Sequence, residues 1–120
     1  MAWQVEVTDE FTAWYEGLDP EQQDRVNAAI DELEERGPAL GRPWVDTLAG
    51  SKLANLKELR VHRDGHLRIL FVFDPRRTAI LLLGGDKTRQ WAEWYRWAIP
   101  EAERLYDMYL EELRREGLLP

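Results

Sequence analysis

Three short apolar runs in the middle of the chain, separated by turn-forming residues, constrain the fold more than any other feature. The runs cover Leu56–Val61, His66–Asp74 and Thr78–Leu83. Asp64–Gly65 separates the first pair and Asp74–Arg77 the second, and Asp, Gly and Pro are typical turn residues. Connections this short join antiparallel neighbours, since a parallel pair needs a crossover of a dozen or more residues. The sequence therefore predicts a three-stranded antiparallel meander.

The segment before the meander predicts a strand followed by two helices. Trp3, Val5 and Val7 alternate with polar residues, as in a half-buried strand. Thr8 is a suitable N-cap for a first helix, and Asp19 with Pro20 starts a second one that ends at Gly37–Pro38. Residues 39–55 have no clear period and predict a loop, with a short extended piece around residues 44–47.

The segment after the meander returns to a helical period. Gly84–Gly85 is expected to end the third strand, and Pro100 is expected to interrupt the helical segment that follows. A last helix should then run to Gly117. The apolar faces of the two helical pieces are predicted from Trp91, Trp94, Tyr95 and Ala98, and from Ala102, Leu105, Tyr109 and Leu113.

The predicted order of elements is β, α, α, β, β, β, α. Strands and helices that are segregated in this way indicate an α+β domain in which helices pack on an antiparallel sheet, in two layers. A chain of 120 residues with 44% hydrophobic residues is sufficient for one core, so residues 1–120 are expected to form a single domain.

Charge and cysteine content limit the function. The chain has no Cys and two His, so a zinc site or a thiol nucleophile is not expected, and no cofactor is implied. No signal-like segment opens the sequence, and its longest apolar run, Ala79–Leu83, is too short for a bilayer, so we expect a cytoplasmic protein without a membrane partner.

The charge is unevenly distributed along the chain. The net charge is −7, yet residues 52–90 carry 9 basic and 4 acidic side chains. This asymmetry predicts one positive face on a negative body.

Two arginines are candidates for a phosphate site, depending on the register of the first hairpin. A three-residue turn at 63–65 would place Arg60 directly opposite Arg68, whereas a two-residue turn at Asp64–Gly65 would pair Arg60 with Ile69. We favour the first register because it directs one apolar set to the core and leaves Arg68 outward and exposed. Two opposed guanidinium groups repel unless an anion lies between them. Replacing such an Arg68 by Ala should leave the melting temperature level or raise it, whereas an Arg68 held in an ion pair with Glu58 or Asp74 would lose a little stability on mutation.

Further basic and aromatic residues surround this pair in the sequence. Arg and Lys next to an aromatic ring can grip an RNA backbone, stack a base and stabilise a phosphorane, while the RNA 2′-hydroxyl acts as the nucleophile. Alternative interpretations are solvated charges for the cations, a core role for the Trp91 stripe, and an ion pair in which Glu58 simply neutralises Arg60. The predicted RNA-binding residues are Lys57, Arg63, Arg89 and Trp91.

At these residues the sequence resembles the RelE/ParE toxin superfamily, in particular its HigB-like, phage-derived branch. The resemblance rests on Leu56–Arg60, Leu67–Phe73 and Ala79–Lys87. It implies a RelE-like fold and a metal-independent, ribosome-dependent endoribonuclease that cuts messenger RNA and is neutralised by a cognate helix-turn-helix antitoxin. It also implies that the catalytic residues are Arg60, Arg68 and Lys87.

Two other functions remain open at the level of the sequence. One is a ParE-like toxin that poisons DNA gyrase without cutting RNA, which would need a surface for a protein partner. The other is a non-catalytic interaction module whose acidic helices bind a partner.

Overall fold

A five-stranded sheet forms the centre of the molecule. The computed structural model describes residues 2–62, 66–86 and 91–119, with the side chain of Trp91 left out. The strand order is β1-β5-β4-β3-β2, in which β1 is parallel to β5 and the other neighbours are antiparallel. The strands are β1 (Val5–Val7), β2 (Val45–Thr47), β3 (Lys57–Arg60), β4 (Leu67–Phe73) and β5 (Ala79–Asp86). The predicted meander is thus confirmed as β3, β4 and β5.

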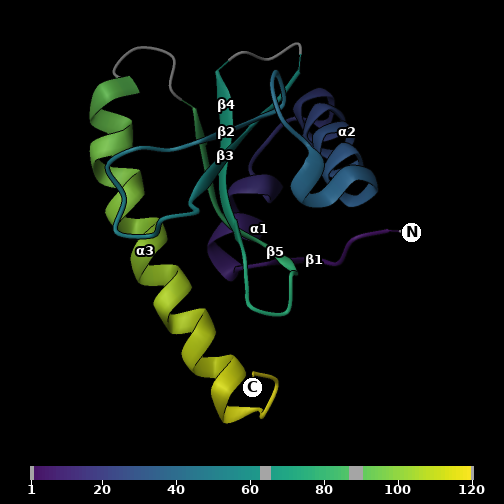
Figure 1. The fold of residues 1–120 in the computed structure, drawn as a ribbon. Coiled ribbons are helices and arrows are strands. Elements are labelled where there is room, and N and C mark those ends of the chain that lie inside the picture. Colours follow the sequence, from purple (N-terminus) through teal and green to yellow (C-terminus); the bar gives the residue numbers. More distant parts are fainter. Residues whose placement is uncertain (1, 63–65, 87–90, 120) are drawn as a thin grey trace.

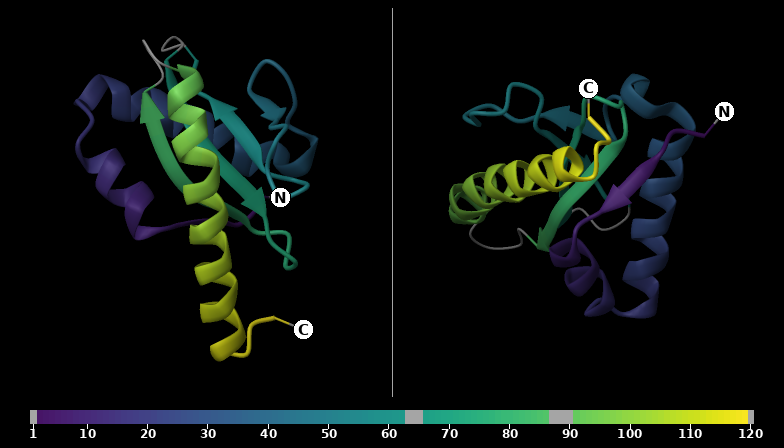
Figure 2. Two further views of the ribbon diagram at one scale, coloured as in Figure 1. Left: turned by 90° about the vertical axis from the view of Figure 1, so that its left-hand side faces the viewer. Right: turned by 90° about the horizontal axis from the view of Figure 1, so that it is seen from below.

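The helices begin where the capping residues predict. Thr8 precedes α1 (Asp9–Glu16), and its hydroxyl accepts a hydrogen bond from the Phe11 N–H at 3.0 Å. Asp19 and Gln22 form a capping box at the start of α2 (Pro20–Arg36), which the 3-10 turn η1 (Gly37–Ala39) ends. The last helix is α3 (Trp91–Arg115), whose C-terminal part runs past the end of the sheet (Figure 2).

The α+β class is confirmed, but the two layers expected from the sequence are three in the structure. Helices α1 and α2 cover one face of the sheet and α3 covers the other (Figure 1). The reason is that β4 is apolar on both faces. Ile69 and Phe71 pack toward α1 and α2, whereas Leu70 and Val72 are buried on the α3 side.

Pro100 does not interrupt the C-terminal helix, so that expectation was wrong. It lies inside α3, which is continuous from Trp91 to Arg115. Ala98 and Ala102, on either side of it, are both fully buried against the same face of the sheet. This packing on both sides outweighs the disruption that proline causes inside a helix, which is about 3 kcal/mol in an exposed one.

Gly84–Gly85 does not end the third strand either, because β5 continues to Asp86. The two glycines instead give two indole rings room to pack, one on each face of the sheet. A Cβ on Gly84 would lie 2.3 Å from Cε3 of Trp14 in α1, and a Cβ on Gly85 would lie 2.2 Å from Nε1 of Trp94 in α3. The glycines therefore mark close packing and not a turn.

Candidate active site

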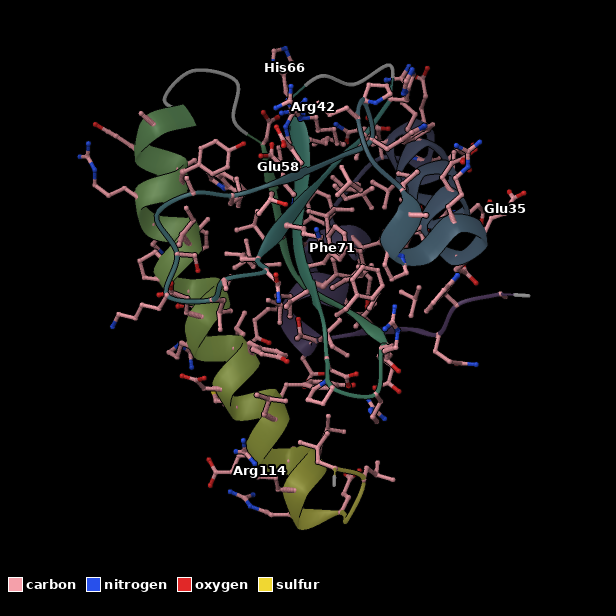
Figure 3. All side chains as sticks on the ribbon, in the orientation of Figure 1. Glu35, Arg42, Glu58, His66, Phe71 and Arg114 are labelled. Atoms are coloured by element: carbon pink, nitrogen blue, oxygen red, sulfur yellow. The ribbon has the colours of Figure 1, made fainter. Side chains whose placement is uncertain are left out.

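The two arginines proposed from the sequence lie side by side at one end of the sheet. Arg60 in β3 pairs directly with Arg68 in β4, which confirms the favoured register. Residues 63–65, the turn itself, lie outside the described part of the chain. By strand alternation, both arginines and Glu58 belong to the face that α3 covers. Figure 3 shows Glu58 on this side and Phe71 on the opposite side of the sheet.

The anion between the arginines is Glu58. Its side chain is 4% exposed, and its Oε1 lies 2.5 Å from Nε of Arg68 and 4.0 Å from Nε of Arg60. Oε1 also accepts a hydrogen bond of 2.5 Å from the hydroxyl of Tyr95 in α3. Three groups from two strands and a helix therefore converge on one buried carboxylate oxygen.

The sequence predicted that Arg68 points outward and is exposed, but in the structure it is buried. Its side chain is 10% exposed, and one terminal nitrogen donates to the carbonyl of Leu67 at 3.0 Å. The cause is α3, which covers the face that was assigned to solvent. The contact with Glu58 favours the alternative of an ion-paired Arg68, so Arg68→Ala is expected to lower stability, because this change would leave the buried carboxylate of Glu58 without its closest cation.

Arg60 is more open and is held from its other side by Asp46 in β2. Its guanidinium lies 3.2 Å from Oδ2 of Asp46, which also accepts from Arg42 at 3.0 Å. Burial opposes ionisation of Asp46, but the hydrogen bond and charge of Arg42, the Thr47 N–H and the charge of Arg60 outweigh it and lower its pKa. Asp46 therefore stays ionised and orients Arg60 toward Glu58.

Two nitrogen atoms in this cluster are buried without a hydrogen-bond acceptor among the described residues. They are Nε of Arg60 and Nε of Arg68. The Arg68 nitrogen is close to Glu58, yet its N–H is not aligned with the carboxylate, so the contact is an ion pair and not a hydrogen bond. Buried donors without an acceptor are uncommon in folded proteins, and a role in catalysis is one explanation for them. Both donors are suited to a phosphate oxygen.

Tyr95 supplies a proton donor to the cluster. Burial raises the pKa of its hydroxyl, and the hydrogen bond to Glu58 and the negative charge of Glu58 raise the pKa further. Tyr95 is thus protonated at neutral pH. Its ring meets that of Trp94 edge-on, with the ring centres 4.9 Å apart.

Trp94 connects α3 to the strand that borders Arg68. It packs over Gly85, and Gly85 is the residue in β5 that pairs with Arg68. The absence of a side chain at Gly85 lets the indole approach the sheet and brings Tyr95 within reach of Glu58. The position of α3 over the arginine pair therefore depends on this glycine.

Of the other residues proposed from the sequence, Lys57 has a described side chain, and it does not join this cluster. Lys57 pairs with Phe71 and lies on the opposite face of the sheet, where Nζ donates to Oγ1 of Thr47 at 3.4 Å. Arg63, Lys87 and Arg89 lie outside the described residues. Trp91 begins α3, and its side chain also lies outside them.

Sequence reasoning missed two members of the site. Glu58 had been considered only as a structural ion-pair partner of Arg60 or Arg68 and not as a reacting group, although its place two residues before Arg60 puts it on the same strand face. Tyr95 had been assigned to the apolar stripe of a helix, and its hydroxyl contact crosses 37 positions of sequence. A tyrosine in a core stripe whose hydroxyl needs a partner was the available signal.

The cluster contains the groups needed for acid–base chemistry at a phosphate. A buried carboxylate can accept a proton, a tyrosine can donate one, and two guanidinium groups can bind an anion. Within the described part of the chain, no three His, Asp or Glu side chains are grouped to hold a metal ion. The described helices include none that is long and apolar enough to cross a membrane.

Comparison with known proteins gives a consistent family. Residues 13–107 match the model of a family described as phage derived protein Gp49-like (DUF891). The HigB2 protein of Mycobacterium tuberculosis is 45% identical over 114 residues, which cover 93% of this chain and 56% of HigB2. HigB3 of the same organism is 47% identical over 97 residues, covering 81% of this chain and 84% of HigB3. Both relatives are named as toxins, and this chain spans little more than half the length of HigB2.

A solved structure shows the fold. The structure of the archaeal RelE–RelB complex from Pyrococcus horikoshii contains a chain that superposes with a TM-score of 0.59. The superposition covers 74% of this chain and 99% of that one, at 19% sequence identity. The fold expected from the sequence is thereby confirmed as RelE-like.

Proposed function

The chain belongs to the family of phage-derived Gp49-like proteins, and on that basis we propose that it is the toxin of a type II toxin–antitoxin pair that cleaves messenger RNA on the ribosome. The nuclease activity is proposed because Arg68, Arg60 and Tyr95 converge on the buried carboxylate of Glu58. A surface that only binds a protein has no need of a buried carboxylate, a protonated tyrosine and two donors without acceptors.

In the proposed reaction, the RNA supplies the nucleophile. Glu58 accepts the proton of a ribose 2′-hydroxyl, whose oxygen then bonds to the adjacent phosphorus. Arg60 and Arg68 turn their unsatisfied N–H groups toward the phosphate oxygens and stabilise the negative charge that develops on the phosphorane. Tyr95 donates its proton to the departing 5′-oxygen. The products are a 2′,3′-cyclic phosphate and a 5′-hydroxyl end, so atoms and protons balance.

Substrate entry requires the closed cluster to open. Glu58 now contacts both Arg68 and Tyr95, so the RNA must replace these contacts with its own 2′-hydroxyl and phosphate groups. Catalytic hydrogen bonds often reach their working geometry only in the complex with substrate. Binding to the ribosome, in the cytoplasm, would supply the ordered messenger RNA.

The proposed partner is a cognate helix-turn-helix antitoxin. A RelE chain has been crystallised with RelB, and the toxin names of the two mycobacterial relatives point the same way. An acidic or helical segment laid over the arginine cluster would block the site by charge complementarity. Residues 1–120 are proposed to act as a single toxin domain.

Expression in a bacterial host tests the proposal. Induction of the chain alone should arrest growth and yield cleaved messenger RNA with 5′-hydroxyl ends, and co-expression of the adjacent antitoxin should restore growth. Glu58→Gln should lose about 10²–10⁴ in cleavage rate because it removes the base. Arg114→Ala, an exposed change near the far end of α3, is the control and should remain toxic. Growth at high expression, or arrest without RNA cleavage, would contradict the nuclease.

A further inference from the structure

A groove begins at the proposed active site and runs along α3. It has a volume of about 400 Å³, within the range of small-ligand sites, and lies between α3 and the loop that joins β2 to β3. Gly50 and Lys52 line it from the loop, and Tyr95, Arg96, Ile99 and Glu103 line it from the helix. Figure 1 shows this loop crossing from the sheet to α3 and back.

Contacts on both sides hold the loop against the helix. Oε2 of Glu103 accepts hydrogen bonds from the Ser51 hydroxyl at 2.7 Å and from the backbone N–H of Lys52 at 2.5 Å. Leu48 and Leu53 pack against the core on the α3 side. The groove therefore has fixed walls, and the carboxylate of Glu103 is already engaged by two donors.

The groove is lined by two cations, Lys52 and Arg96, and one anion, Glu103, so it carries a net positive charge in a protein whose net charge is −7. Lys52 and Arg96 are exposed at opposite walls, and among the described residues neither side chain has a hydrogen-bond or ion-pair partner. Ile99 and Tyr95 also line the groove and contribute apolar surface to it. Cations beside a flat aromatic ring are typical of sites that bind single-stranded nucleic acid.

Tyr95 is shared by the groove and the active site. Its hydroxyl contacts Glu58, and the same residue lines the groove, so a strand whose phosphate lies at Arg60 and Arg68 would continue past Tyr95. We propose that the groove binds the nucleotide next to the scissile phosphate, with a backbone phosphate between Lys52 and Arg96 and the base against Tyr95 and Ile99. This inference rests on the proposed nuclease function.

The test uses ribosomes programmed with messenger RNA and the purified toxin. Lys52→Ala/Arg96→Ala should reduce kcat/KM by about tenfold through KM, as expected for the loss of charge-assisted hydrogen bonds to a phosphate. The dependence of KM on salt should also weaken, by a slope of about one for each phosphate that the variant no longer binds. Lys52→Arg/Arg96→Lys, which keeps both charges, should retain the wild-type KM. Arg114→Ala/Arg115→Ala removes the same charge from the far end of α3 and should leave KM and its salt dependence unchanged.

The outcomes separate this inference from the function on which it rests. If the wild type cleaves and Lys52→Ala/Arg96→Ala has the same KM, the inference is wrong and the nuclease stands. If that variant cleaves normally but binds the antitoxin more weakly, the groove takes an acidic segment of the antitoxin, which also overturns the inference. If the folded wild type cleaves no RNA on the ribosome, the proposed function fails, and the groove assignment fails with it.

Discussion

Arg68 and Glu58 lie diagonally across strands β4 and β3, and Nε of Arg68 is 2.5 Å from Oε1 of Glu58 beneath α3. The same contact thus neutralises a buried carboxylate and holds the proposed phosphate-binding group. A substitution at this pair should therefore change both the activity and the stability of the protein. A substitution of an exposed arginine would change the activity alone.

Arg68→Ala tests this coupling. The cleavage rate should fall by about 10²–10³, the usual effect of losing one preorganised donor, and the free energy of unfolding should fall by about 3 kcal/mol because Glu58 keeps a buried charge without its closest partner. Primer extension and urea denaturation measure the two effects. Glu58→Gln/Arg68→Ala should regain part of the stability and none of the activity. An Arg68→Ala variant as stable as the wild type would show that the pair contributes nothing to the fold.

The adjacent glycines of β5 provide a matched pair of substitutions. Gly85→Ala should push Trp94 away from the sheet, and Gly84→Ala should push Trp14 away on the other face. Each change should destabilise the protein by about 1–3 kcal/mol through overpacking. Only Gly85→Ala should also reduce cleavage beyond its loss of folded protein, because Trp94 adjoins Tyr95. Equal loss of activity in the two folded variants would contradict the role assigned to Gly85.

A second polar cluster, at the other end of the β4–β5 hairpin, makes stability depend on pH. The hydroxyl of Tyr109 in α3 donates to Glu6 in β1. This hydrogen bond lowers the pKa of Glu6 below its ordinary value of 4.5, burial opposes the shift, and the hydrogen bond and charge of Arg76 add to it. Burial and the bond to Glu6 raise the pKa of Tyr109 to about 12, so Tyr109 is a donor throughout the acid range.

Tyr109→Phe should therefore destabilise the protein in a pH-dependent way. A carboxyl group whose pKa is lowered by folding stabilises the fold above its unfolded pKa, and this stabilisation is lost as the pH falls through the folded pKa. The difference in unfolding free energy between wild type and variant should be full at neutral pH and shrink below about pH 4.5. Denaturant titrations at several pH values measure it. Tyr15→Phe is the control, since Tyr15 donates to the neutral amide oxygen of Asn27 and its effect should not change with pH.

The antitoxin complex should weaken as salt rises. If an acidic segment covers the arginine cluster, added salt screens the attraction between the two surfaces. Titration calorimetry at about 50 and 200 mM salt measures this, and Arg60→Ala should reduce the salt dependence more than Arg114→Ala does. An affinity that is independent of salt would instead indicate an apolar interface elsewhere, such as α1 and α2.

The sequence by itself indicated most of the local structure and favoured the register that the structure has. Alternating apolar residues and the turn residues between them predicted β3, β4 and β5, and the same alternation placed Arg60 opposite Arg68. Thr8 and Asp19 marked the starts of α1 and α2 because their side chains bond to backbone groups three residues away. All of these signals act within a few residues, so they can be read without knowledge of the rest of the fold.

Only the tertiary structure decided which face α3 covers, and that choice turned an exposed Arg68 into a buried one. It also showed that Gly84–Gly85 accommodates Trp14 and Trp94, and that burial on both sides keeps α3 continuous through Pro100. The contact of Tyr95 with Glu58 joins residues 37 positions apart. Local propensity carries no information on such contacts, because an apolar stripe states that a helix packs against something without stating what it packs against.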